Sequence, residues 1–134
     1  DLIALGRQKG FAVFSGADTR LPEVLALGVA GCIGGLVNIA PDLMVHLFRV
    51  GREGAPSDSS PAFERLREIG AIVDRLTFPL NVAAGMEARG LAPGAPKAIV
   101  SAASARLYRE IVGDLRARFS DWNLAFAQTV EPAA

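Results

Sequence analysis

The chain has little cysteine and no recognisable leader. Cys32 is its single cysteine, so no disulfide can form within the chain. A lone cysteine suits a reducing compartment. The opening residues Asp-Leu-Ile-Ala-Leu-Gly-Arg lack the basic segment that begins a signal peptide. We therefore expect a cytoplasmic protein.

An excess of charge of either sign is also absent. Fourteen basic residues balance 14 acidic ones, and no basic stripe runs along the sequence, which argues against a nucleic-acid partner. Hydrophobic residues make up 51% of the chain and charged residues 21%, which is typical of a globular rather than a disordered protein. A length of 134 residues is enough for a domain with a buried core.

A run long enough to cross a bilayer is missing as well. The uncharged stretch 24–40 is shorter than the roughly twenty apolar residues of a span, and glycines and Asn38 interrupt it. Gly31 and Gly35 form a GxxxG pair, which has meaning only within a convincing span. Uncharged stretches also arise where a parallel strand is buried on both faces, and we favour that interpretation and no membrane partner.

Metal-ligand and nucleophile patterns are equally sparse. His46 is the only histidine, and no cysteine, aspartate or glutamate pattern accompanies it, so we expect a structural or surface role and no metal. Cys32 stands among small residues and is expected to be inert packing. A catalytic thiol would need a partner base, and His46 is not obviously placed to be one.

Two strands and their connecting helices are predicted in the first half of the chain. Residues 1–9 are typical of a helix end with Gly10 as its left-handed cap. The predicted elements that follow are a strand at Phe11–Ser15, a turn at Ser15–Asp18, a helix at Pro22–Leu27 that Gly28 ends, a strand at Cys32–Val37 and a helix that begins at Pro41. This is a βαβα order, which is typical of parallel sheets.

Helices dominate the prediction for the second half. The polar segment 51–60 is predicted to be a surface loop. Apolar residues recur at helical spacing over 61–78, a shorter helix runs over 79–89, and a loop covers 91–97. A final helix follows with Ser104 as its cap, and its apolar residues on one face are Leu107, Ile111, Leu115 and Phe119. We therefore divide the chain into 1–54, the βα part, and 55–134, a helical domain.

Polar candidates and glycines gather after the two predicted strands. Asp18 could serve an active site at the strand ends or could cap the helix that follows it. The glycines around Gly34 could cradle a phosphate, although no lysine follows them as in phosphate-binding loops. Two parallel strands cannot close a sheet, so further strands must come from another chain or segment.

The same residues resemble the dihydrodipicolinate synthase/N-acetylneuraminate lyase family. The similarity is clearest in Ser15-Gly16-Ala17-Asp18 and in Gly31-Cys32-Ile33-Gly34-Gly35-Leu36-Val37-Asn38 with Pro41 after it. It implies an α/β fold, namely the last two strands of a (β/α)8 TIM barrel followed by a C-terminal helical bundle. It also implies a cytoplasmic homotetramer.

The resemblance implies a class I aldolase or lyase that acts on a pyruvate-type 2-keto acid. The lysine that forms the Schiff base would lie upstream of Asp1, so no catalytic residue is expected in this chain and no cofactor is implied. The substrate-binding residues would be Gly16, Asp18, Ile33 and Gly35, with the Ile33 carbonyl near the imine. Lys9 ends a helix and Lys97 lies in a loop, so neither is expected to be desolvated enough to form an imine.

Some positions depart from the family pattern. Thr19 replaces a glutamate and Gly35 a serine of sialic-acid lyases, and Ala17 stands where the synthases have a second carboxylate. The Gly34-Gly35 pair is closer to members acting on sugar-derived 2-keto acids. The alternative is a non-catalytic module that contributes only strands and oligomer contacts. The residue that ends the strand before Asp1 would separate the two, since only the enzyme needs a lysine there.

Overall fold

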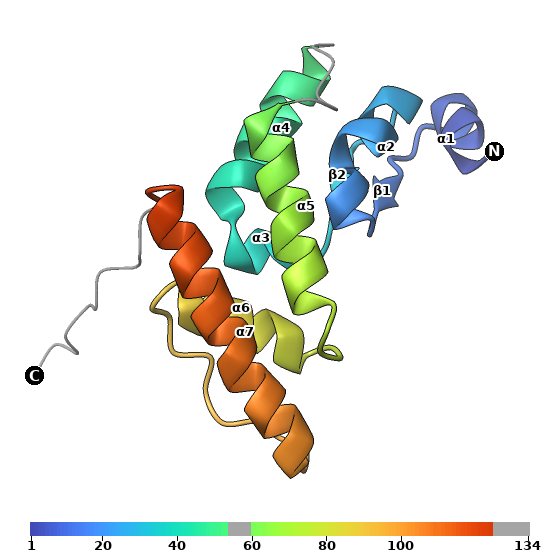
Figure 1. Cartoon of the computed structure of the whole chain (residues 1–134). Coiled ribbons are helices and arrows are strands. Elements are labelled where there is room, and N and C mark those ends of the chain that lie inside the picture. The colour runs from blue at the N-terminus through green and yellow to red at the C-terminus, as the bar shows by residue number, and fades with distance from the viewer. Residues whose placement is uncertain (54–59, 125–134) are drawn as a thin grey trace, which may run out of the picture. The chain divides into compact units, whose positions relative to one another are not determined.

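The computed structural model describes residues 1–53 and 60–124 (Figure 1). The chain forms two compact units, Asp1–Gly70 and Ala71–Ala134. Its elements are α1 (Leu2–Lys9), β1 (Phe14–Ser15), the 3-10 turn η1 (Asp18–Arg20), α2 (Leu21–Leu27), β2 (Gly31–Cys32), α3 (Leu36–Ile39), α4 (Pro41–Arg52), α5 (Pro61–Val73), α6 (Leu80–Ala88) and α7 (Ala102–Asp121). The described part of the chain is thus mostly helical, with a small sheet in the first unit. The predicted domains 1–54 and 55–134 stay a prediction.

The sheet consists of β1 and β2, which pair in parallel as expected. Phe14 pairs with Gly31 and Ser15 with Cys32. Both strands are shorter than predicted, and the expectation of a strand through Val37 is wrong, because Leu36 and Val37 belong to helix α3. Their apolar, partly β-branched side chains favour a strand locally, but the chain turns at Gly34 and Gly35 and starts a helix there.

Glycine and proline set the helix boundaries of the first unit largely as predicted. Gly10 and Gly28 end α1 and α2 in the left-handed conformation, with φ of 78° and 99°. Pro41 begins α4, which runs to Arg52. Gly51 and Arg52 are therefore helical rather than part of the predicted loop, whose residues 54–59 lie outside the described ones.

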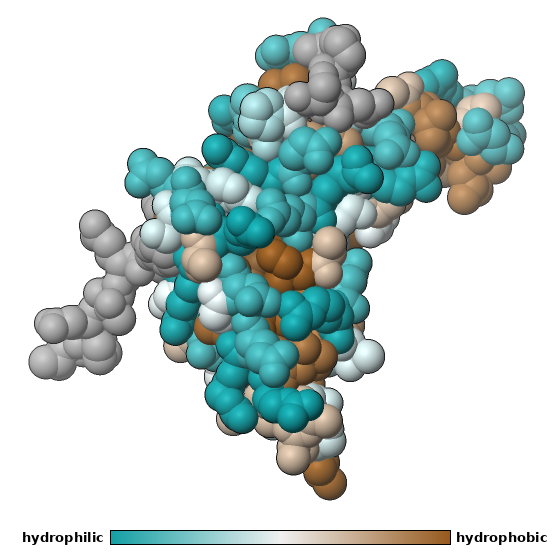
Figure 2. All heavy atoms as spheres, in the orientation of Figure 1, coloured by the Kyte–Doolittle hydropathy of each residue, from teal (hydrophilic) through white to brown (hydrophobic). Residues whose placement is uncertain are grey.

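Helices α2 and α4 pack together in the first unit and bury its core. Helices α3 and α5 contribute to this core as well, and the largest fully buried side chains of the unit are Leu21, Ile39, Leu47, Leu66 and Ile69. The strands, in contrast, are not buried on both faces as expected: Phe14 is 55% exposed, and Ile33, which follows β2, is 72% exposed. Figure 2 shows further hydrophobic surface around α1, where Leu2 is exposed. Apolar surface therefore remains uncovered beside the sheet.

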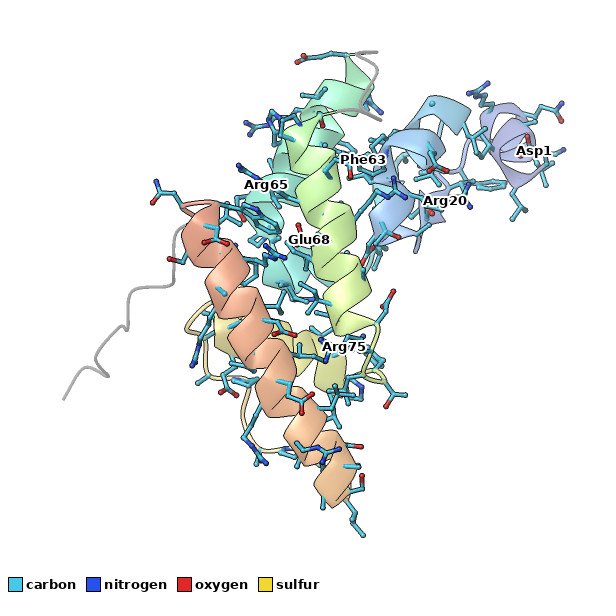
Figure 3. All side chains as sticks on the ribbon, in the orientation of Figure 1. Asp1, Arg20, Phe63, Arg65, Glu68 and Arg75 are labelled. Carbon is cyan, nitrogen blue, oxygen red and sulfur yellow. The ribbon has the colours of Figure 1, made fainter. Side chains whose placement is uncertain are left out.

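The second unit is built mainly by α6 packed against α7. Ile111, Leu115 and Phe119 form the buried stripe of α7, as their spacing predicts. Two polar links tie the unit together: the Tyr108 hydroxyl donates to Glu87 Oε2 at 2.7 Å, and Arg75, labelled in Figure 3, pairs with Asp114 at 2.6 Å. Burial, the hydrogen bond to Glu87 and its charge raise the pKa of Tyr108 above its ordinary value.

The cap of α7 differs from the prediction by one turn. Ser101, not Ser104, is the N-cap, and its Oγ accepts a hydrogen bond from the backbone N–H of Ser104 at 3.1 Å. Sequence spacing fixes such boundaries poorly, because both serines suit a cap. Separately, no helix within the described residues is both long and apolar enough to cross a bilayer.

Candidate functional site

The candidate site lies in the two loops that follow β1 and β2. Because the strands are parallel and Ser15 pairs with Cys32, Gly16 and Ile33 both stand directly beyond the carboxyl ends of the sheet. The backbone N–H of Ile33 donates to the Ser15 carbonyl at 2.9 Å. A Cβ added at Gly16 would lie 3.8 Å from the carbonyl oxygen of Ile33. The structure thus brings these two predicted residues side by side.

Asp18 reaches from the first loop to the second. Its Oδ2 accepts a hydrogen bond from the backbone N–H of Leu36 at 2.8 Å, and its Oδ1 accepts one from Cys32 Sγ at 3.1 Å. The expectation that Asp18 could cap the helix after it is wrong, because α2 has Arg20 as its N-cap and no side-chain capping bond. Asp18 instead accepts from the first backbone N–H of α3, the helix whose N-cap is Gly35.

The Cys32 thiol is held in its protonated form by these surroundings. Burial first, and then the hydrogen bond to Asp18 and its negative charge, together raise the pKa of Cys32 to about 12. A thiol nucleophile needs the opposite shift. Cys32 therefore serves as a hydrogen-bond donor to Asp18, which agrees with the expectation that it is chemically inert.

Gly35 is the N-cap of helix α3 and lies between Gly34 and Leu36, which both contact Asp18. Its backbone has φ of −74° and ψ of −38°, a helical conformation open to any residue. Its carbonyl accepts hydrogen bonds from the backbone N–H and the side-chain amide of Asn38. All four predicted substrate-binding residues, Gly16, Asp18, Ile33 and Gly35, therefore lie in two adjoining loops. Whether they bind substrate stays a prediction.

The other candidate residues lie in different surroundings. His46 is exposed on α4, and Lys9 and Lys97 are exposed too, so neither lysine sits in the desolvated setting that imine chemistry requires. In residues 1–53 and 60–124, no group of three or more His, Cys, Asp or Glu side chains is arranged to hold a metal ion.

Gly34 is the residue of this region whose role the sequence did not reveal. A Cβ added there would overlap the carboxylate of Asp18. The sequence offered one signal of a close contact, the two consecutive glycines Gly34 and Gly35 within the predicted strand. Spacing alone could not show which side chain comes close, because Asp18 stands on the other loop.

These features are compatible with part of an α/β fold: a small parallel sheet among helices, with the candidate residues beyond the carboxyl ends of its strands, where ligands bind in such folds. The sequence model of the dihydrodipicolinate synthetase family matches residues 3–116, and the chain belongs to that family, as its motifs predicted.

Two curated relatives have matching sequences. A 4-hydroxy-tetrahydrodipicolinate synthase of Methanopyrus kandleri is 29% identical over 65% of this chain and 29% of its own length. The probable 2-dehydro-3-deoxy-D-pentonate aldolase YjhH of Escherichia coli K12 is 36% identical over 46% of this chain and 21% of its own length. The matches thus cover less than a third of each relative. No solved structure matches the chain significantly.

Proposed function

We propose that this chain is the C-terminal part of a class I aldolase or lyase that makes or cleaves a carbon–carbon bond of a pyruvate-type 2-keto acid. Its strands β1 and β2 would be the last two of a (β/α)8 barrel, and its later helices the bundle that follows. An upstream segment would supply the Schiff-base lysine and a proton-relaying tyrosine. Family membership and the four residues gathered beyond the parallel strands support this assignment.

The chemistry would proceed through an imine. The lysine ε-amino group condenses with the keto carbonyl and releases water, and the protonated imine then accepts the electron pair of the breaking carbon–carbon bond as an enamine. In the synthetic direction the enamine attacks an aldehyde instead. Gly16, Asp18, Ile33 and Gly35 would edge the substrate cavity, with the Ile33 carbonyl directed toward the imine.

The exposed apolar side chains beside the sheet support the proposal that the chain is part of a barrel. Phe14 and Ile33 lie at a two-stranded sheet that other strands could extend, and such a sheet alone is marginal in water. The matched relatives are also several times longer than the matched segments. A barrel completed by preceding strands would cover both side chains.

The substrate class that we favour is a sugar-derived 2-keto acid. Thr19 and Gly35 depart from the sialic-acid pattern, and Ala17 removes a carboxylate that the synthases carry. The aldolase relative named for a 2-dehydro-3-deoxy-pentonate supports the same choice.

Borohydride trapping tests the proposed reaction. Incubation of the full-length protein with pyruvate and borohydride should reduce the imine to a stable adduct on one lysine upstream of Asp1. Peptide mass spectrometry should find Lys9 and Lys97 unmodified, because both are exposed to water rather than desolvated in a pocket. An adduct on Lys9 or Lys97 would contradict the proposed upstream location of the Schiff-base lysine. The absence of any adduct would favour the alternative, a non-catalytic module.

Assembly provides a second test of the barrel. The full-length protein should be a homotetramer in light scattering, as the family resemblance implies. The 134-residue chain alone should aggregate or melt without cooperativity, because its strand edges and apolar side chains are uncovered. A sharp cooperative melt of a monomeric chain would show that no further strands are needed.

A further inference from the structure

One carboxylate ties both ends of the loop between β2 and α3. The loop consists of Ile33, Gly34 and Gly35. Cys32, the last residue of β2, donates to Asp18 Oδ1, and Leu36, the first residue of α3, donates to Asp18 Oδ2. The two donors therefore bracket the three loop residues, and a shift of either loop end would break one of these bonds.

The loop also fits against Asp18 at its centre. A Cβ on Gly34 would overlap the carboxylate, so only glycine leaves room for it. Glycine has more backbone freedom than any other residue, and two of the three loop residues are glycines. The loop therefore gains its fixed shape from an outside contact rather than from its own side chains.

We propose that Asp18, although it lies at the edge of the proposed cavity, is a positioning residue: its carboxylate holds the Ile33–Gly35 loop through Cys32, Gly34 and Leu36 and does not itself bond to the substrate. We call Asp18 and these three contact residues the Asp18 clamp. Both carboxylate oxygens already have protein donors. The contacts of the clamp are observed in the structure and do not depend on the proposed function. The role of the clamp in catalysis, which is to position the Ile33 carbonyl and the Gly35 backbone, rests on the proposed function.

The Cys32 thiol reports on the clamp directly. The negative charge of Asp18 contributes to the raised pKa of Cys32, but burial is the larger cause. Loss of the carboxylate should therefore lower the midpoint of the pH profile for Cys32 alkylation without returning it fully to an ordinary thiol value. Peptide-level mass spectrometry of the full-length protein isolates this cysteine from any other.

Three variants and one control separate positioning from other roles. Asp18→Ala removes both acceptors, and Gly34→Ala displaces the carboxylate. Asp18→Asn keeps an oxygen that can accept from the Leu36 N–H but removes the charge. Glu23→Ala is the control, because Glu23 is an exposed carboxylate nearby that pairs with Arg20 (labelled in Figure 3) at 2.6 Å.

The clamp predicts different patterns for thiol and loop. Alkylation profiles of Cys32 should shift to lower pH in all three variants and stay unchanged in Glu23→Ala. Hydrogen exchange in the segment that contains Leu36 should rise in Asp18→Ala and Gly34→Ala but much less in Asp18→Asn. An unchanged alkylation profile and unchanged exchange in Asp18→Ala would overturn the clamp, whether or not the protein forms an imine.

Turnover of the 2-keto acid substrate tests the positioning role. We expect kcat to fall about tenfold in Asp18→Ala and Gly34→Ala with little change in KM, since a displaced loop misplaces reacting groups. Asp18→Asn should keep most of the wild-type kcat. A loss in Asp18→Asn as large as in Asp18→Ala, with a raised KM, would show that the charge binds substrate, and the positioning role would be wrong. Failure of the wild type to form an imine would instead contradict the proposed function. The Cys32 alkylation profiles and the hydrogen exchange of the Leu36 segment would still test the clamp in that case.

Discussion

Replacement of Phe119 by alanine should destabilise the second unit by about 3–5 kcal/mol, the usual cost of removing a buried phenylalanine ring. Phe119 is fully buried on α7, with exposure of 0%. Its ring contacts Trp122 at 6.4 Å between centroids, and the Arg89 guanidinium lies 5.6 Å from the ring centroid. A cavity here would remove all these contacts at once. Hydrogen exchange along α7 would measure the loss as faster exchange.

Two variants serve as controls for this result. Phe119→Leu keeps most of the buried volume and should cost much less. Arg109→Ala changes an exposed residue on the same helix and should stay within about 0.5 kcal/mol of wild type. Equal exchange in Phe119→Ala and Arg109→Ala would show that the stripe of Ile111, Leu115 and Phe119 does not hold the unit together.

Replacement of Gly35 by valine should reduce turnover on the order of 100-fold, the effect of a misplaced reacting group. The backbone of Gly35 is helical, with φ of −74°, so valine meets no left-handed strain and the fold should persist. The new side chain would instead fill space beside the proposed substrate. Steady-state kinetics with the 2-keto acid measures the effect, and a circular dichroism melt checks the fold.

The neighbouring residues supply the comparison for Gly35→Val. Ile33→Val keeps the backbone carbonyl and should leave turnover near the wild-type value. Gly16→Val should reduce turnover like Gly35→Val. A glycine at a turn often has a positive φ, where valine would be strained, but Gly16 does not have one, so no backbone strain is expected. Undiminished turnover in Gly35→Val would mean that the loop after β2 does not shape the pocket.

Local signals in the sequence predicted most of the helix boundaries. Gly10 and Gly28 act as left-handed caps, and Pro41 begins a helix, because each of these residues restricts or permits backbone angles by itself. The apolar stripe of α7 followed in the same way from its spacing. Such features depend on neighbours within a turn or two, which a sequence displays.

Features that depend on distant partners escaped prediction. The segment Leu36–Ile39 was expected to begin as a strand, yet Asp18 provides a hydrogen-bond acceptor for its first N–H and a helix forms. The same carboxylate explains why Gly34 has no side chain. Ser104 was a reasonable cap, but α7 begins earlier, at Ala102, and Ser101 caps it. The four candidate site residues could be identified because they stand in family motifs. The contacts of Asp18 could not be predicted, because its partners lie on another loop.

The contacts of Asp18 have a further consequence for the order of folding. Its two hydrogen bonds join residues only 14 and 18 positions apart, so the loop they close is short. Closing a short loop costs less chain entropy than closing a long one, so we expect these contacts to form early. A ribosome adding roughly 5–20 residues per second makes the stretch from β1 to α3 within a few seconds. The backbone that carries Gly16, Ile33 and Gly35 can therefore take shape while α7 has still to be synthesised.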